Sequence, residues 1–312
     1  MKARGSILFF CVVLIALIPM AVHSEYLINL IILFFLYVVV AQSWNLLGGF
    51  AGQVSLGHSA FFGTGALITR LLWVSHVPMP ASLLLGGLAA VLLAAIVGIP
   101  CLRMRPAYFP IGTLALAMIA QITVANIFPL PGSLSGEYLA AYRVLPRYYL
   151  AFVTALATVA IVSLIVRSRT GLALVAIRDD EPAAAAMGVR TVRYKVQSLM
   201  VSSFLAGLGG GVFAYHQVSY YYYAPFDLSW SFLPTLTTFI GGLGTIVGPL
   251  AGAACFLGLS EVFALSLGEV HIVVFAFFFI LVVLFVPGGL MSLNVKVRGL
   301  FARLVRRAGS PP

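Results

Sequence analysis

Apolar stretches long enough to cross a lipid bilayer recur along the whole chain, with no polar stretch of domain length between them. A membrane-spanning helix needs roughly 17 to 25 predominantly apolar residues. Only 8% of the residues are charged, whereas a soluble domain carries about 25%. The sequence therefore predicts an all-α, polytopic integral membrane protein, embedded in the bilayer as one transmembrane domain over residues 1–312.

The apolar stretches predict ten spans, and the basic residues predict their orientation. The spans are 6–22, 26–47, 54–75, 81–101, 107–129, 148–166, 196–216, 229–242, 249–267 and 270–287. With the N-terminus inside, 15 of the 18 Lys and Arg residues face the cytoplasm, as the positive-inside rule expects. Both termini are therefore predicted to be cytoplasmic, and the net charge of +10 is explained by topology rather than by nucleic-acid binding. Without a break at 241–249 the count falls to nine. The first stretch also resembles a cleavable signal peptide.

Two glycine-rich stretches predict interrupted helices. In "LLGGFAGQVSLGHSAFFGTGAL" (46–67) and "FIGGLGTIVGPLAGAACFLGL" (239–259), a Gly-Gly pair ends an apolar run and polar or Pro residues follow. In transporters, unwound backbone of this kind lies against protein or a water-filled path. We therefore predict that a translocation path is lined by Gly48, Gly49, Gly52, Gln53, Ser55, Gly57, His58, Gly241, Gly242 and Gly244. The alternative for the glycines is close helix packing.

His58 is an ionisable residue within an apolar region, which makes it a functional candidate. One alternative is a neutral imidazole bonded to a neighbouring helix, and another is a side chain that lines the path. A metal site is disfavoured because no second ligand is suitably spaced.

Charge is concentrated in "GLALVAIRDDEPAAAAMGVRTVRYK" (171–195), which holds seven charged residues. The acidic run 179–181 precedes Pro182, an arrangement typical of a helix start, and Gly188 is a natural helix stop. A helix this short is marginal in water, so we expect it to lean on a neighbour. Its small-residue face predicts insertion into a groove of a partner; an ordinary solvated loop is the alternative.

Motifs for catalysis or nucleotide binding are absent from the sequence. No G-x-x-x-x-G-K-[ST] run occurs, although that loop cradles the phosphates in many ATPases. We therefore expect a protein that is not an enzyme and binds no cofactor or metal of its own. If ATP drives it, separate subunits hydrolyse the ATP.

The charged segment resembles the coupling loop of ABC importer permeases, which carries an acidic-Ala-Ala motif followed by Gly. The matching residues are Glu181, Ala183, Ala184 and Gly188. Together with "WNLLGGFAGQVSLGHSAFFGTGAL", "GLGGGVFAY", "GGLGTIVGPLAGA" and the final "FVPGGL", it makes nearly the whole chain similar to LivM-type permease subunits of branched-chain amino acid importers.

This resemblance implies a heteromeric importer in a bacterial inner membrane. The expected partners are a second, related permease subunit, two cytoplasmic ATPase subunits that use ATP, and a periplasmic solute-binding protein. Residues 167–195 would form the cytoplasmic coupling loop. Its expected ATPase-coupling residues are Arg178, Asp179, Asp180, Glu181, Ala183, Ala184, Met187 and Gly188.

The solute remains open at this point. Family members usually carry a Gly-Gly-x-Asp-Gly-like signature after the fifth span, where this chain reads "PLPGSLSGEYLAAYR" (129–143). The family also includes permeases for urea, short amides and other small organic solutes. A third alternative is an ion-coupled secondary transporter, for which His58 and Glu261 are the candidate ion-coupling residues.

Overall fold

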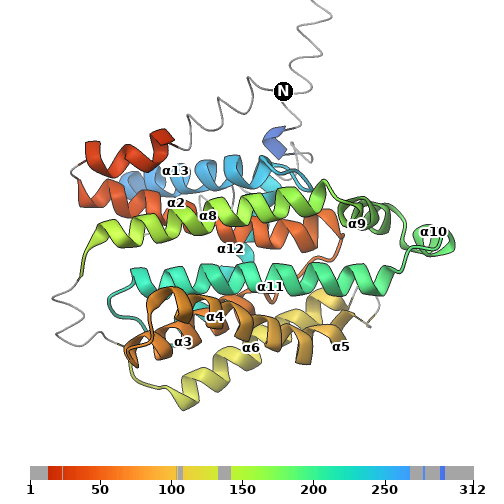
Figure 1. The fold of residues 1–312 in the computed structure, drawn as a ribbon, viewed down its shortest axis with the longest axis horizontal. Helices are drawn as coiled ribbons and strands as arrows, with labels where there is room; N and C mark the ends of the chain where they lie inside the picture. The colour runs from red at the N-terminus through yellow and green to blue at the C-terminus, as the bar shows by residue number, and fades with distance from the viewer. Residues whose placement is uncertain are drawn as a thin grey trace, which may run out of the picture.

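The computed structural model describes residues 13–22, 24–102, 104, 108–132, 142–267, 277 and 289–291. These residues form helices joined by turns, with one isolated β-bridge between Pro131 and Tyr221 (Figure 1). The all-α prediction is thus confirmed. The helices are α2 (Glu25–Asn45), α3 (His58–Val74), α4 (Met79–Leu93), α5 (Ile99–Leu102), α6 (Phe109–Ile127), α8 (Val144–Val166), α9 (Arg169–Asp179), α10 (Glu181–Ala186), α11 (Thr191–His216), α12 (Ser229–Gly241) and α13 (Gly248–Leu267). The other helical segments are two π-helical segments, Leu46–Phe50 and Ala94–Gly98, and one 3₁₀ turn, Ala224–Phe226.

Each predicted span from 26–47 to 249–267 corresponds to helix in the structure. Five helical segments are long and apolar enough to cross a membrane, namely Glu25–Phe50, Met79–Leu102, Phe109–Ile127, Val144–Val166 and Thr191–His216. Of the predicted span 6–22, residues 13–21 are described and helical. The span 270–287 lies outside the described residues, apart from Phe277. The same holds for most of the loop 129–143 and of the motif 285–290.

Helix α11 is the centre of the bundle. It packs against α2, α3, α4 and α8, and Figure 1 shows it running between α8 on one side and α4 on the other. In the most apolar window of α11, 72% of the residues are buried, compared with 22% for α6. A helix surrounded by others, as α11 is, needs no polar face. Helix α6, with few buried residues, lies at the periphery of the bundle.

Helices α3 and α11 approach so closely that side chains are excluded between them. A Cβ on Gly65 would collide with the carbonyl oxygen of Gly207, and a Cβ on Gly210 with that of Phe62. In lipid, where no hydrophobic drive pulls helices together, small residues stabilise such contacts by allowing close backbone packing. The glycines of "FLAGLGGGVFAY" therefore serve helix packing.

At the end of the bundle opposite α10, Arg70 of α3 is fully buried. Its Nη1 donates to the carbonyl oxygens of Ala214 (3.0 Å) and Gln217 (3.1 Å). Its Nη2 donates to those of Gly132 (2.6 Å) and Val218 (2.8 Å). A buried guanidinium is costly unless it is hydrogen-bonded. Arg70 meets this requirement by fixing the turns that follow α6 and α11.

Candidate functional site

The short helix α10 has the ends that the sequence predicts. Asp180 is its N-cap, and the Asp180 Oδ1 accepts a hydrogen bond from the backbone N–H of Ala183 (2.9 Å). Such a cap satisfies a helix donor that would otherwise be unpaired. Pro182 occupies the first turn, and Gly188, with φ +85°, follows the last turn. The predicted helix start and stop are confirmed.

The expected support for α10 comes from α11. Lys195 Nζ forms a 2.5 Å ion pair with Glu181 Oε2, and the Lys195 side chain is 7% exposed. Ala184 is 6% exposed, so this alanine faces inward, away from any partner. Of the alanines, Ala183, Ala185 and Ala186 are the exposed ones.

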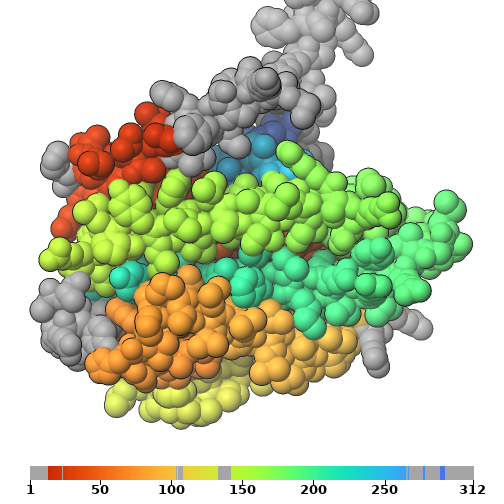
Figure 2. Space-filling model, viewed as in Figure 1, coloured from red at the N-terminus to blue at the C-terminus, as the bar shows by residue number. Residues whose placement is uncertain are grey.

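The exposed residues of α10 and of the two positions that follow it carry no charge. They are Pro182, Ala183, Ala185, Ala186, Met187 and Gly188. Met187, at 86%, is more exposed than any other large hydrophobic side chain in the described part of the chain. Figures 1 and 2 show α10 projecting from one end of the bundle, beyond α9. This exposed apolar segment is a candidate contact surface.

Both predicted helix interruptions are present. The first helix runs through α2 and the π-helical segment to Phe50, and α3 does not begin until His58. The predicted span 54–75 therefore starts about one turn too early, because residues 51–57 are not helical. The second interruption separates Gly241, the end of α12, from Gly248, the start of α13. We call residues 51–57 the first break and 242–247 the second break.

The end of α2, which leads into the first break, is bonded to the second break. The Asn45 Oδ1 accepts from the N–H of Gly244 (2.9 Å), and the Asn45 Nδ2 donates to the carbonyl oxygen of Thr245 (2.8 Å). One turn earlier, Gln42 Nε2 donates to the carbonyl oxygen of Ile246 (2.5 Å). Asn45 and Gln42 are fully buried. Sequence reasoning missed both, although their amides within an apolar helix were a usable signal, since buried polar groups need partners.

Arg178 connects the projecting segment to this junction. It lies near the end of α9, two residues before the N-cap of α10. Its Nη1 donates to the carbonyl oxygen of Gly49 (3.0 Å), and its Nε and Nη2 donate to Asp179 Oδ1 (3.2 and 3.1 Å). The structure thereby brings together two groups of residues that the sequence predicts separately, the coupling residues and the glycines of the interrupted helices.

The polar residues around the first break bond within the chain. The Trp44 Nε1 donates to the carbonyl oxygen of Ser55 (2.8 Å). Gln53 and Ser55 are buried, and a Cβ on Gly57 would collide with the Thr113 carbonyl of α6. These contacts close the first break against α2 and α6 in this conformation.

His58 is fully buried at the start of α3. Its Nε2 lies 3.0 Å from the Ser202 Oγ of α11, whose hydroxyl donates to the Ser43 carbonyl of α2 (2.6 Å). Since that hydroxyl proton is engaged, Nε2 of His58 carries the proton and donates. The structure thus shows the alternative in which His58 bonds a neighbouring helix.

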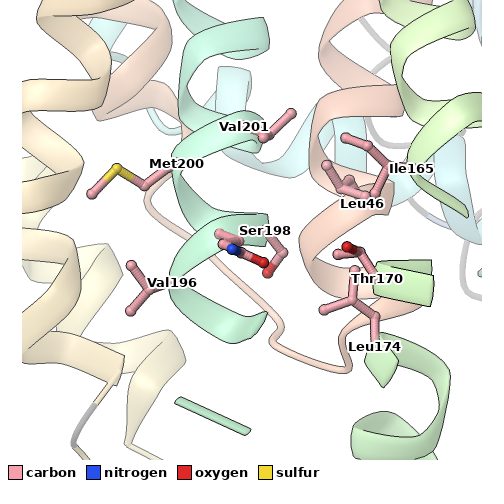
Figure 3. A pocket seen from close by; sticks show the side chains of 9 residues that line it. Leu46, Ile165, Thr170, Leu174, Val196, Ser198, Met200 and Val201 are labelled. Carbon is pink, nitrogen blue, oxygen red and sulfur yellow. The ribbon is translucent and has the colours of Figure 1, made fainter. Parts of the chain in front are cut away.

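An apolar pocket lies behind α9. It has a volume of about 480 Å³ and lies between α9, the adjoining ends of α2 and α8, and α11. Figure 3 shows Thr170 and Leu174 of α9 and Leu46 on one side of it, opposite Ser198 and Val201 of α11. The pocket leaves unfilled space beside Thr170 and Leu174 of α9.

These features define the class of the protein, an all-α, multi-pass membrane protein with interrupted helices and a short helix that projects from one end of the bundle. The chain belongs to the family described as the permease component of the branched-chain amino acid transport system, whose profile matches residues 26–287.

Two relatives are similar over most of the chain. It is 23% identical to the high-affinity branched-chain amino acid transport system permease protein LivM of Escherichia coli (strain K12), over 90% of this chain and 75% of the relative. It is also 23% identical to LivM of Salmonella typhimurium (strain LT2), over 83% of this chain and 68% of that relative. No solved structure shows a significant match.

Proposed function

We propose that this chain is the membrane-spanning permease subunit of an ATP-driven importer of branched-chain or other apolar amino acids in a bacterial inner membrane. Its family membership supports the transport role. In this proposal residues 1–312 form one transmembrane domain, and both termini and residues 167–195 are cytoplasmic. The chain performs no chemistry and holds no cofactor. ATP is used by its partner subunits.

The proposed assembly contains this chain, a second related permease subunit, two cytoplasmic ATPase subunits and a periplasmic solute-binding protein. Each permease docks on one ATPase subunit through its short helix, which is α10 here. The binding protein delivers the amino acid at the opposite end of the bundle. Closure of the ATPase pair on ATP displaces α10, and the two breaks rearrange to open the path to one side of the membrane at a time.

One observation carries this proposal, the exposed face of α10. Its alanines present no side chain that would obstruct a groove, and Met187 is 86% exposed at its end. A methionine side chain adapts to irregular apolar surfaces, and a short helix set into a groove is a common mode of recognition. The charges of Asp180 and Glu181 are engaged within the chain, so docking on this face buries few charged groups.

Copurification tests the docking. The permeases and ATPase subunits are coexpressed, and the ATPase retained by the tagged chain is measured in detergent. We expect Met187→Asp to reduce the retained ATPase about tenfold, because a carboxylate would be buried unpaired in the groove. Ser75→Asp is the matched control, since Ser75 is exposed beyond α3 at the opposite end. Equal retention by Met187→Asp and wild type would refute docking through α10.

The cargo is tested separately with the whole complex in proteoliposomes. Radiolabelled leucine is supplied with the cognate binding protein, and excess valine, urea or acetamide is added as competitor. We expect valine to compete and the two small amides to have no effect. Competition by urea or acetamide alone would instead assign the chain to the permeases for small organic solutes.

A further inference from the structure

We propose that Arg178 is a positioning residue that transmits displacement of α10 to both helix breaks. This inference rests on the proposed function and deepens it by naming the residue that links the docking helix to the path. The guanidinium lies between the exposed segment that ends in α10 and the glycines beside both breaks.

The guanidinium is in contact with both interrupted helices. Its Nη1 donates to the carbonyl oxygen of Gly49 (3.0 Å), in the last turn before the first break. A Cβ on Gly52 would lie 3.0 Å from Cγ of Arg178, and a Cβ on Gly244 would lie 2.6 Å from its Nη1. Both glycines have positive φ, +70° and +68°, so each makes a turn and leaves room for the arginine.

Asp179 fixes the orientation of the guanidinium. Its Oδ1 accepts from both Nε and Nη2 of Arg178 (3.2 and 3.1 Å), which leaves Nη1 directed at Gly49. The planar guanidinium supplies these donors in a fixed geometry, whereas a lysine ammonium is a single flexible centre. The arrangement therefore requires arginine at this position and a carboxylate next to it.

The path from α10 to the breaks is short. Asp180 is the N-cap of α10, and Asp179 and Arg178 precede it directly in the chain. A displacement of α10 is thus delivered to the Gly49 carbonyl through three consecutive residues. Because Asn45, at the end of α2, bonds both Gly244 and Thr245, the second break moves with the end of α2 that leads into the first break.

The surroundings permit this movement. The pocket of about 480 Å³ behind α9 leaves space on its inner face, so α9 can shift without forcing its way into a close-packed core. In this proposal the contact of Arg178 with Gly49 couples each shift of α9 to a rearrangement of the two breaks.

Arg178→Gln tests the inference in the complete importer, reconstituted with its ATPase subunits and binding protein. Leucine uptake and ATP hydrolysis are measured in the same proteoliposomes. We expect the amount of leucine imported per ATP hydrolysed to fall about tenfold, which corresponds to the loss of one charge-assisted hydrogen bond. Copurification of the ATPase subunits should stay unchanged. A merely destabilised chain would lower uptake and hydrolysis together and leave their ratio intact.

Three further variants sharpen the test. Arg169→Gln is the matched control, because Arg169 is an exposed arginine at the other end of α9, and it should leave the ratio unchanged. Asp179→Asn, at a largely exposed side chain, should lower the ratio about threefold, since it weakens only the orientation of Arg178. The double variant should be no worse than Arg178→Gln, because both changes act through one contact.

The outcomes separate this inference from the proposed function. A wild-type complex that does not import leucine would refute the proposed function. A wild-type complex that imports leucine, with Arg178→Gln and Asp179→Asn both within twofold of its ratio, would overturn the role of Arg178. Loss of the ATPase subunits from Arg178→Gln would also overturn it, since Arg178 would then act in docking. If Arg178→Gln does not fold, Asp179→Asn decides alone.

Discussion

Replacing Asn45 with leucine should separate the end of α2 from the second break. Leucine has the same branching as asparagine but cannot bond the N–H of Gly244 or the carbonyl oxygen of Thr245, both of which Asn45 now pairs. A buried group left unpaired costs about 1–3 kcal/mol, whereas side-chain hydrogen bonds between membrane helices average about 0.6 kcal/mol. For two bonds we therefore expect the free energy of unfolding to fall by about 1–6 kcal/mol.

The assay is thermal unfolding of the purified chain in detergent, followed by the loss of its monodisperse peak. A loss of this size lowers the midpoint by about 2–9 °C. Ser43→Ala is the matched control, because Ser43 is equally buried in α2 and its hydroxyl bonds only the Val40 carbonyl of the same helix. Equal midpoints for Asn45→Leu and Ser43→Ala would refute the idea that Asn45 ties the end of α2 to the second break.

Three other substitutions test the packing of the bundle and of α10. Arg70→Met removes the guanidinium that fixes the turns after α6 and α11. Amide hydrogen exchange in those turns should therefore rise at least about tenfold. Unchanged exchange would contradict the role of Arg70 in fixing them. Gly210→Ala should lower the unfolding midpoint because α3 must move away from α11. The control Gly258→Ala in α13, with open space around its Cβ, should leave the midpoint unchanged. Equal midpoints for the two variants would show that the contact between α3 and α11 is not tight. Lys195→Met leaves Glu181 unpaired, so amides 183–188 should exchange faster while those of α2 stay protected. Equal protection of α10 in both proteins would argue against this anchor.

Local features of the fold could be predicted from the sequence. Apolar stretches located the helices, because a bilayer requires continuous apolar segments that satisfy their own backbone. The caps of α10 were also predictable, since Asp180 and Gly188 act on neighbouring backbone only. The start of α3 was misplaced because Val54 and Leu56 continue the apolar pattern through a segment that is not helical.

Contacts between distant residues could not be predicted in this way. Arg178 and Gly49 are 129 positions apart, and Asn45 and Gly244 are 199 apart, so no local spacing indicates that they meet. The alanine run likewise does not show which alanine faces inward. That is decided by the packing of α10 on α9 and α11, which buries Ala184 and exposes Met187.

ATP dependence of uptake tests the central claim most directly. This chain is reconstituted into proteoliposomes with its partner permease and the binding protein, with or without the two ATPase subunits, and radiolabelled leucine uptake is measured with ATP on the ATPase side. The account predicts uptake only when both the ATPase subunits and ATP are present. Leucine accumulation without either of them, driven by an ion gradient alone, would contradict it.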